Sequence, residues 1–124
     1  MDFFSKGIEA YKNKNYKAAI NFWEKSLNKK DLINKSSCYY NIGCCFIQLK
    51  EFENAIKYLN KSLENGNFSN KTYFNLAQSY YQLKNYKQAY IAISNALSYD
   101  NDDKDTINLE RRILTFLLEE IKNK

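Results

Sequence analysis

Three cysteines, Cys38, Cys44 and Cys45, are the side chains of this 124-residue chain best suited to covalent or metal chemistry. A thiol nucleophile needs a neighbouring base such as imidazole, and a structural zinc site needs four ligands. The sequence contains no His and no second cysteine cluster that could supply them. We therefore expect reduced cysteines that are buried or groove-facing, no metal and no cofactor.

Other catalytic patterns are also missing from the sequence. It has no Gly-rich phosphate loop and no Gly-x-Ser-x-Gly turn, and the adjacent Glu119 and Glu120 would point in different directions on a helix. These observations predict a protein that is not an enzyme. No apolar run reaches the length of a signal peptide or a membrane span, so we expect a cytoplasmic protein.

The charge of the chain is basic but dispersed. Residues 1–98 hold 14 Lys and 7 acids, whereas residues 99–124 hold 5 Lys or Arg and 7 acids. The lysines are scattered along the chain, which is typical of a solvated surface. Binding of nucleic acid through this charge and the 11 Tyr is kept as a distant alternative.

The chain repeats one pattern three times. Tyr39–Leu63 is closely matched thirty-four residues later by Tyr73–Leu97, and a more divergent copy lies thirty-six residues before the second. Each copy has two stretches of helical periodicity separated by a polar link and an aromatic residue. A small residue in the first stretch precedes an Ala in the second by twelve positions, which predicts close approach of two helices. These pairs are Gly7 and Ala19, Gly43 and Ala55, and Ala77 and Ala89.

The pattern resembles the tetratricopeptide repeat, W-x2-L-G-x2-Y followed by A-x3-F and Pro. The second copy supplies Tyr39, Ile42, Gly43, Phe46, Ala55 and Leu59 at the motif positions, and the third supplies Tyr73, Leu76, Ala77, Tyr80, Ala89 and Ile93. The first copy is weaker and supplies Phe3, Gly7, Ala19 and Trp23. Asp31, Asn67 and Asn101 replace the closing Pro.

The resemblance implies an all-α fold, a right-handed superhelical array of antiparallel helix pairs of the α-solenoid type. We expect one domain over residues 1–124, with repeats at about 2–30, 36–67 and 70–101. The link within residues 28–37 is two residues longer than the next link, and we expect it to hold an extra turn of helix.

Residues 104–123 are predicted to form a seventh helix that caps the array and begins near Asp102, Asp103 or Asp105. Its apolar residues span an arc of about 200°, wider than the stripe that a surface helix needs. Two interpretations stay open: a well-buried last helix, or a surface through which the chain forms a homodimer. The predicted oligomer face is Ile113, Phe116 and Leu117.

The resemblance also implies that the first helix of each pair lines a concave binding surface. This predicted groove is mostly apolar and aromatic, which favours a helix or an extended peptide of a partner protein. Self-filling of the groove is the competing interpretation. The predicted groove residues are Phe4, Ile8, Tyr11, Tyr40, Asn41, Cys44, Ile47, Lys71, Phe74, Asn75, Gln78 and Tyr81.

One subclass of the family holds the C-terminal carboxylate of chaperones in a clamp of five residues. This chain matches two of the five, Asn41 and Lys71, and has Phe4, Ile8 and Asn75 at the other positions. A carboxylate held without a second cation would be weakly bound. The sequence therefore predicts a protein-binding adaptor or scaffold that does not use the chaperone clamp.

Overall fold

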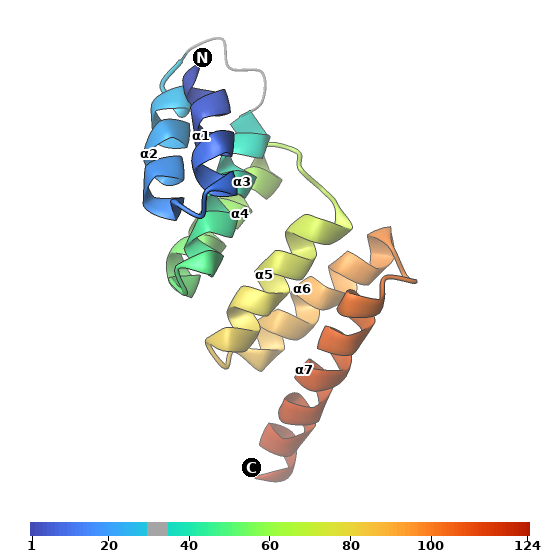
Figure 1. Ribbon diagram of the computed structural model, residues 1–124. Helices are drawn as coiled ribbons and strands as arrows, with labels where there is room; N and C mark the ends of the chain where they lie inside the picture. Colours follow the sequence, from blue (N-terminus) through green and yellow to red (C-terminus); the bar gives the residue numbers. More distant parts are fainter. Residues whose placement is uncertain (30–34) are drawn as a thin grey trace. The chain divides into compact units, whose positions relative to one another are not determined.

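The computed structural model describes residues 1–29 and 35–124, and in these ranges the chain forms seven α-helices and no strands (Figure 1). The helices are α1 (Phe3–Lys12), α2 (Tyr16–Leu27), α3 (Lys35–Gln48), α4 (Phe52–Glu64), α5 (Asn70–Gln82), α6 (Tyr86–Tyr99) and α7 (Lys104–Lys122). The predicted all-α fold of three helix pairs and a final helix is confirmed. Residues 30–34 of the longer link, where we expected an extra turn, lie outside the described residues.

The helices group into two compact units, residues 1–67 with α1 to α4 and residues 68–124 with α5 to α7. In the first unit α1 packs on α2, α2 on α3, and α3 on α4. In the second unit α5 packs on α6, and α7 packs mainly on α6. The superhelical winding and the single domain remain predictions.

Small residues allow the two helices of each pair to approach closely. All six predicted small residues are buried. A Cβ atom on Gly43 would lie 2.9 Å from Cγ of Leu59 on α4, closer than packed side chains normally come. The spacing of twelve residues in the sequence therefore does mark the contact between paired helices, as predicted.

Three tight turns join the paired helices, and each contains a Lys in the left-handed region. Lys14, Lys50 and Lys84 have φ angles of 60°, 59° and 61°. In the second turn the amide of Lys50 donates to the carbonyl of Ile47, and the amide of Glu51 donates to that of Phe46. These are the two hydrogen bonds of a Schellman ending, in which Gly is the usual left-handed residue.

The caps of the last helix agree with the sequence. Asp103 is the N-cap of α7, its side chain accepts from the amide of Thr106, and Asp105 lies in the first turn. This confirms one of the three acids that the sequence proposed as N-cap. Among the described residues, no helix has the length and apolar character needed to cross a bilayer.

Candidate functional site

The first unit contains a pocket of about 320 Å³ between α1 and α3. We call it the first-unit pocket. Helix α1 contributes side chains three and four positions apart, and α3 does the same, so each set lies on one face of its helix. The pocket is lined by Ile8, Tyr11, Lys12, Trp23, Tyr40, Asn41 and Cys44.

Trp23 of α2 anchors this pocket within the core. Its side chain is 2% exposed, and its Nε1 donates a hydrogen bond to the carbonyl of Phe4 at 3.1 Å. The rings of Phe4 and Tyr11 lie 6.4 Å and 6.2 Å from the indole, measured between centroids. The rigid indole therefore fixes the positions of the aromatic rings on α1.

The pocket is apolar, and burial disfavours ionisation of two of its side chains, Cys44 and Tyr11. Burial raises the pKa of the Cys44 thiol to about 11, although a hydrogen bond with Tyr40 opposes this shift. Burial also raises the pKa of the Tyr11 hydroxyl, and the nearby Cys44 adds to the shift. Of the lining residues, Lys12 alone carries a charge at neutral pH. The pocket therefore suits an apolar group that has a negative charge beside it.

Five of the seven groove residues predicted on α1 and α3 line this pocket, namely Ile8, Tyr11, Tyr40, Asn41 and Cys44. The other two, Phe4 and Ile47, are half-buried and do not line it. Phe4 instead packs on the core cluster around Trp23. The sequence analysis did not predict that Lys12 and Trp23 line this pocket, because it counted Trp23 only as a motif residue and Lys12 as a surface charge.

The second unit places the third copy's groove residues differently, because α7 lies close to them. Phe74 and Gln78 of α5 line a pocket of about 210 Å³ together with Asp105, Asn108, Leu109 and Arg112 of α7. The α7 residues Asn108 and Arg112 follow Phe74 and Gln78 by the thirty-four-residue period of the repeat. That period, continued into the last helix, is the sequence pattern that could have identified them.

The remaining groove predictions in this unit have separate environments. Lys71 is exposed and Asn75 is half-buried. Tyr81 is half-buried, with its ring centroid 5.8 Å from Tyr86 and 5.9 Å from Phe116. The ring of Tyr81 is thus partly covered by α7.

The predicted oligomer face needs one correction. Ile113 is completely buried within the structure, so it is not available to a second molecule. It was grouped with exposed residues because the sequence showed one wide apolar arc and not which part of it faces the rest of the chain. Phe116, which is 39% exposed and packs on Tyr86, and the half-buried Leu117 remain untested as oligomer residues.

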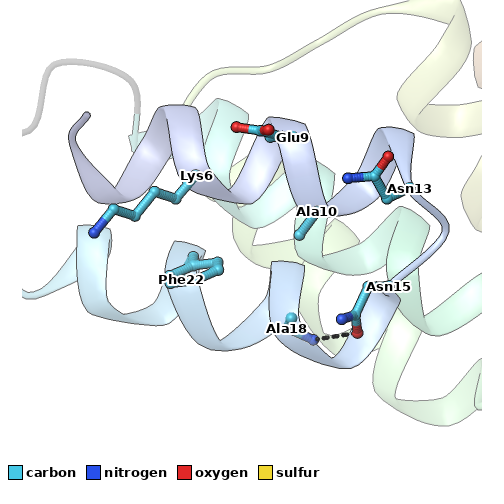
Figure 2. Close-up of a pocket in the computed structure, with 7 residues that line it drawn as sticks. All are labelled: Lys6, Glu9, Ala10, Asn13, Asn15, Ala18 and Phe22. Atoms are coloured by element: carbon cyan, nitrogen blue, oxygen red, sulfur yellow. Dashed lines mark hydrogen bonds between the residues drawn. The ribbon is translucent and has the colours of Figure 1, made fainter.

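A further pocket, of about 410 Å³, lies on a different side of α1 and α2 (Figure 2). Figure 2 shows Lys6, Glu9 and Asn13 spaced along α1, with Phe22 on α2. In the second copy the equivalents of Lys6 and Glu9 are Ile42 and Cys45, which are fully buried in the cluster with Trp23. The pocket is therefore a polar version of the face through which the second repeat packs on the first. End repeats of helical arrays typically carry such polar faces.

The described part of the chain has no group of three or more His, Cys, Asp or Glu side chains arranged to hold a metal ion. Cys38, Cys44 and Cys45 are free thiols, and burial raises the pKa of each. A raised pKa lowers the thiolate fraction and therefore the nucleophilicity at neutral pH.

Stacked helix pairs with an apolar pocket between their first helices define a helical-repeat protein of the interaction class. Models of one family, described as the tetratricopeptide repeat, match residues 36–65 and residues 71–103. The chain belongs to the tetratricopeptide repeat family. This family is generally a non-catalytic protein-interaction fold.

Solved structures agree with this assignment. The TPR domain of OM64 from Arabidopsis is 25% identical with a TM-score of 0.80, and the match covers 90% of each chain. The Hsp90 co-chaperone Cns1 from Saccharomyces cerevisiae is 26% identical with a TM-score of 0.84, over 98% of this chain and 39% of that one. The first TPR of Spaghetti (RPAP3), solved with the HSP90 peptide SRMEEVD, has a TM-score of 0.86 at 21% identity, over 94% of this chain and 90% of that one.

Proposed function

We propose that this protein is a cytoplasmic, non-catalytic adaptor that holds a helix or an extended segment of a partner protein in an apolar, Tyr-rich groove. The observation that carries the proposal is the first-unit pocket, in which Tyr11, Tyr40 and Trp23 surround a space of about 320 Å³. Such a space accepts a large apolar side chain, and Tyr and Trp are enriched where a few residues dominate binding.

The charge at the rim narrows the class of partner. Lys12 is exposed beside an otherwise uncharged pocket, and the side-chain amide of Asn41 offers both a donor and an acceptor. We propose that the occupant has a large apolar residue as anchor, an acidic residue next to it, and a backbone segment that bonds to Asn41. The solved RPAP3 domain was bound to the HSP90 peptide SRMEEVD, which supports a peptide segment as occupant.

The chaperone carboxylate clamp is not part of this proposal. Phe4 and Ile8 stand at two of its positions and Asn75 at a third. Phe4 packs on Trp23, so no cation is supplied there. Recognition by an apolar anchor therefore differs from recognition of a terminal carboxylate.

A random peptide library displayed on phage and selected on the immobilised protein tests the proposal. We expect enriched sequences that combine a large apolar residue with a neighbouring Asp or Glu. Fluorescence anisotropy of one selected peptide should show binding weakened about tenfold or more by Tyr40→Ala, since truncating a central aromatic anchor typically costs about 2 kcal/mol or more and about 1.4 kcal/mol is tenfold in affinity. Lys12→Glu should weaken the binding of acidic peptides and leave the binding of uncharged peptides unchanged.

Phe22→Ala is the matched control, because it truncates an aromatic residue of the same unit that lines the polar pocket of Figure 2. Circular dichroism first establishes that each variant keeps its helices. Loss of binding in Phe22→Ala with full binding in Tyr40→Ala would reject the first-unit pocket. Failure of any peptide to be enriched would reject the adaptor proposal.

A further inference from the structure

The pocket of about 210 Å³ between α5 and α7, which we call the second-unit pocket, differs in chemistry from the first-unit pocket. Two of its lining side chains, Phe74 and Leu109, are apolar. The others are polar or charged, namely Gln78, Asp105, Asn108 and Arg112. A pocket with this lining suits a polar group on a short hydrocarbon stem better than a large apolar side chain.

The second-unit pocket occupies the position in the repeat that corresponds to the first-unit pocket. Gln78 of α5 follows Cys44 by thirty-four residues, and Arg112 of α7 follows Cys44 by sixty-eight. Each of these three residues lines a pocket between its own helix and another helix that begins a repeat or continues the period. Helix α7 therefore supplies one wall of a pocket in the way that α3 does in the first unit.

The charge of Arg112 has no partner in the described part of the chain. Its side chain is exposed, and no described residue forms an ion pair or a hydrogen bond with it. Asp105, the acid among the lining residues, is seven positions away, about 10 Å along the helix axis. The helix neighbours of Arg112 at three and four positions are uncharged: Asn108, Leu109, Thr115 and Phe116. The guanidinium is thus available to an anion of another molecule.

Two side-chain amides add hydrogen-bond donors to the same pocket. Asn108 lies one turn before Arg112 on α7, and Gln78 is half-buried on α5. No described residue forms a hydrogen bond with either side-chain amide. Each amide carries two N–H donors, and the planar guanidinium carries five in a fork that matches a carboxylate. These donors favour a carboxylate as the ligand.

We propose that the second-unit pocket binds a glutamate side chain of the partner segment. Its carboxylate lies at Arg112, within reach of the two amides, and its methylene groups pack on Phe74 and Leu109. This inference deepens the proposed function, because it adds a contact of different chemistry with the same segment. A space of about 210 Å³ accommodates one such side chain.

Asp105 limits how many acids the pocket accepts. Its carboxylate lies on the same face of α7 as Asn108 and Arg112, but toward the start of the helix. Two like charges about 10 Å apart in water repel by about 0.4 kcal/mol, a factor of about two in affinity. The pocket therefore favours a single glutamate over a run of acids.

An NMR titration of the full ¹⁵N-labelled chain with the peptide acetyl-Gly-Glu-Gly-amide tests the proposal. We expect saturable shifts of the side-chain N–H signals of Gln78, Asn108 and Arg112. The peptide acetyl-Gly-Gln-Gly-amide is the matched probe, since it has the same shape without the charge, and it should bind about threefold or more weakly. The absence of saturable shifts at these side chains, or equal binding of the two peptides, would overturn the proposal.

Variants separate a specific pocket from general surface charge. Arg112→Gln should weaken binding of the Glu peptide about threefold to tenfold, because it removes a partly exposed ion pair. Arg111→Gln is the matched control, since Arg111 is also exposed but does not line the pocket. Asp105→Asn should strengthen binding about twofold at low salt. Equal weakening by Arg111→Gln, or weaker binding in Asp105→Asn, would contradict a carboxylate held at Arg112.

This test fails independently of the test of the proposed function. The Glu peptide has no large apolar residue, so Tyr40→Ala should bind it like the wild type. If selected peptides bind through Tyr40 but are unaffected by Arg112→Gln, the adaptor proposal stands and the glutamate site is rejected. If the Glu peptide binds at Arg112 but no library peptide is enriched, the glutamate site stands and the adaptor proposal is rejected.

Discussion

A Cβ atom added to Gly7 would lie 2.6 Å from Cε2 of Trp23, so α1 and α2 touch where the indole meets the glycine backbone. The indole cannot easily move aside, because its Nε1 is bonded to the carbonyl of Phe4 and its ring is buried. Trp23 therefore has two roles: it packs against Gly7, where α1 and α2 approach each other, and it lines the first-unit pocket.

Gly7→Ala should therefore lower the free energy of unfolding by about 1 to 3 kcal/mol, the usual cost of overpacking. Trp23 is the only Trp of the chain, and its fluorescence during urea unfolding measures the effect on the first unit. Gly43→Ala should lower the free energy of unfolding by less, because the contacting atoms of Leu59 belong to a flexible side chain. An increase in stability, as for an ordinary helical Gly→Ala change, would contradict the assigned contact.

Lys50→Gly should stabilise the protein by about 0.5 to 1 kcal/mol. Lys50 has a φ angle of 59°, and the left-handed region costs a side-chain-bearing residue more than it costs Gly. The urea midpoint of helix unfolding by circular dichroism measures the change. Lys57→Gly is the control, because it places the same substitution at an exposed position inside α4 and should destabilise by about 1 kcal/mol.

The stability that depends on Cys45 should decline above pH 9. Burial raises the pKa of this thiol from 9.0 to about 12, and repulsion from Cys44 adds to the shift. The fold thus favours the neutral thiol, and this contribution is complete below the unfolded pKa of 9.0 and is lost as the pH rises toward 12. The difference in urea midpoint between wild type and Cys45→Ala should shrink from pH 8 to pH 10.5, about the range over which these pKa values act. A constant difference would show that the thiol ionises equally in both states.

Thiol labelling measures how burial affects a second cysteine, Cys44. At pH 8 the native protein should react with a disulfide reagent at Cys44 about a hundredfold more slowly than the unfolded chain, because burial raises the pKa of this thiol from its ordinary value of 9.0 to about 11. Stopped-flow absorbance with and without urea measures the two rates. Equal rates would mean that the Cys44 thiol is accessible and ordinarily acidic.

Asn70→Asp should destabilise the second unit by about 1 to 3 kcal/mol. The side-chain amide of Asn70 donates to the carbonyl of Ala96 and to Oγ1 of Thr106, both at 3.1 Å, and so joins α5, α6 and α7. A carboxylate there would place an acceptor against two acceptor oxygens. Thermal unfolding followed by circular dichroism measures the loss, and Asn95→Asp on the exposed face of α6 should leave the midpoint nearly unchanged.

Much of the fold could be predicted from the sequence because the repeat encodes it locally. The spacing between Gly43 and Ala55 identified the helix contact, and the polar links identified the turns. Five groove residues of the first unit also gather in one pocket, since residues three and four apart on a helix share a face whatever the helix packs against. The left-handed conformation of Lys14, Lys50 and Lys84 could not be predicted from the sequence, because Gly is the usual residue at such positions.

The sequence by itself determined the repeat, the helices and which residues share a helix face. Only the tertiary structure decided which apolar face is covered: Ile113 is buried, whereas Leu118, on a different side of the same helix, is exposed. It also decided that Asn70 bonds to Thr106, thirty-six residues away. The physical reason is that periodicity records the orientation of side chains around one axis, whereas burial and long-range hydrogen bonds depend on which other helix lies opposite.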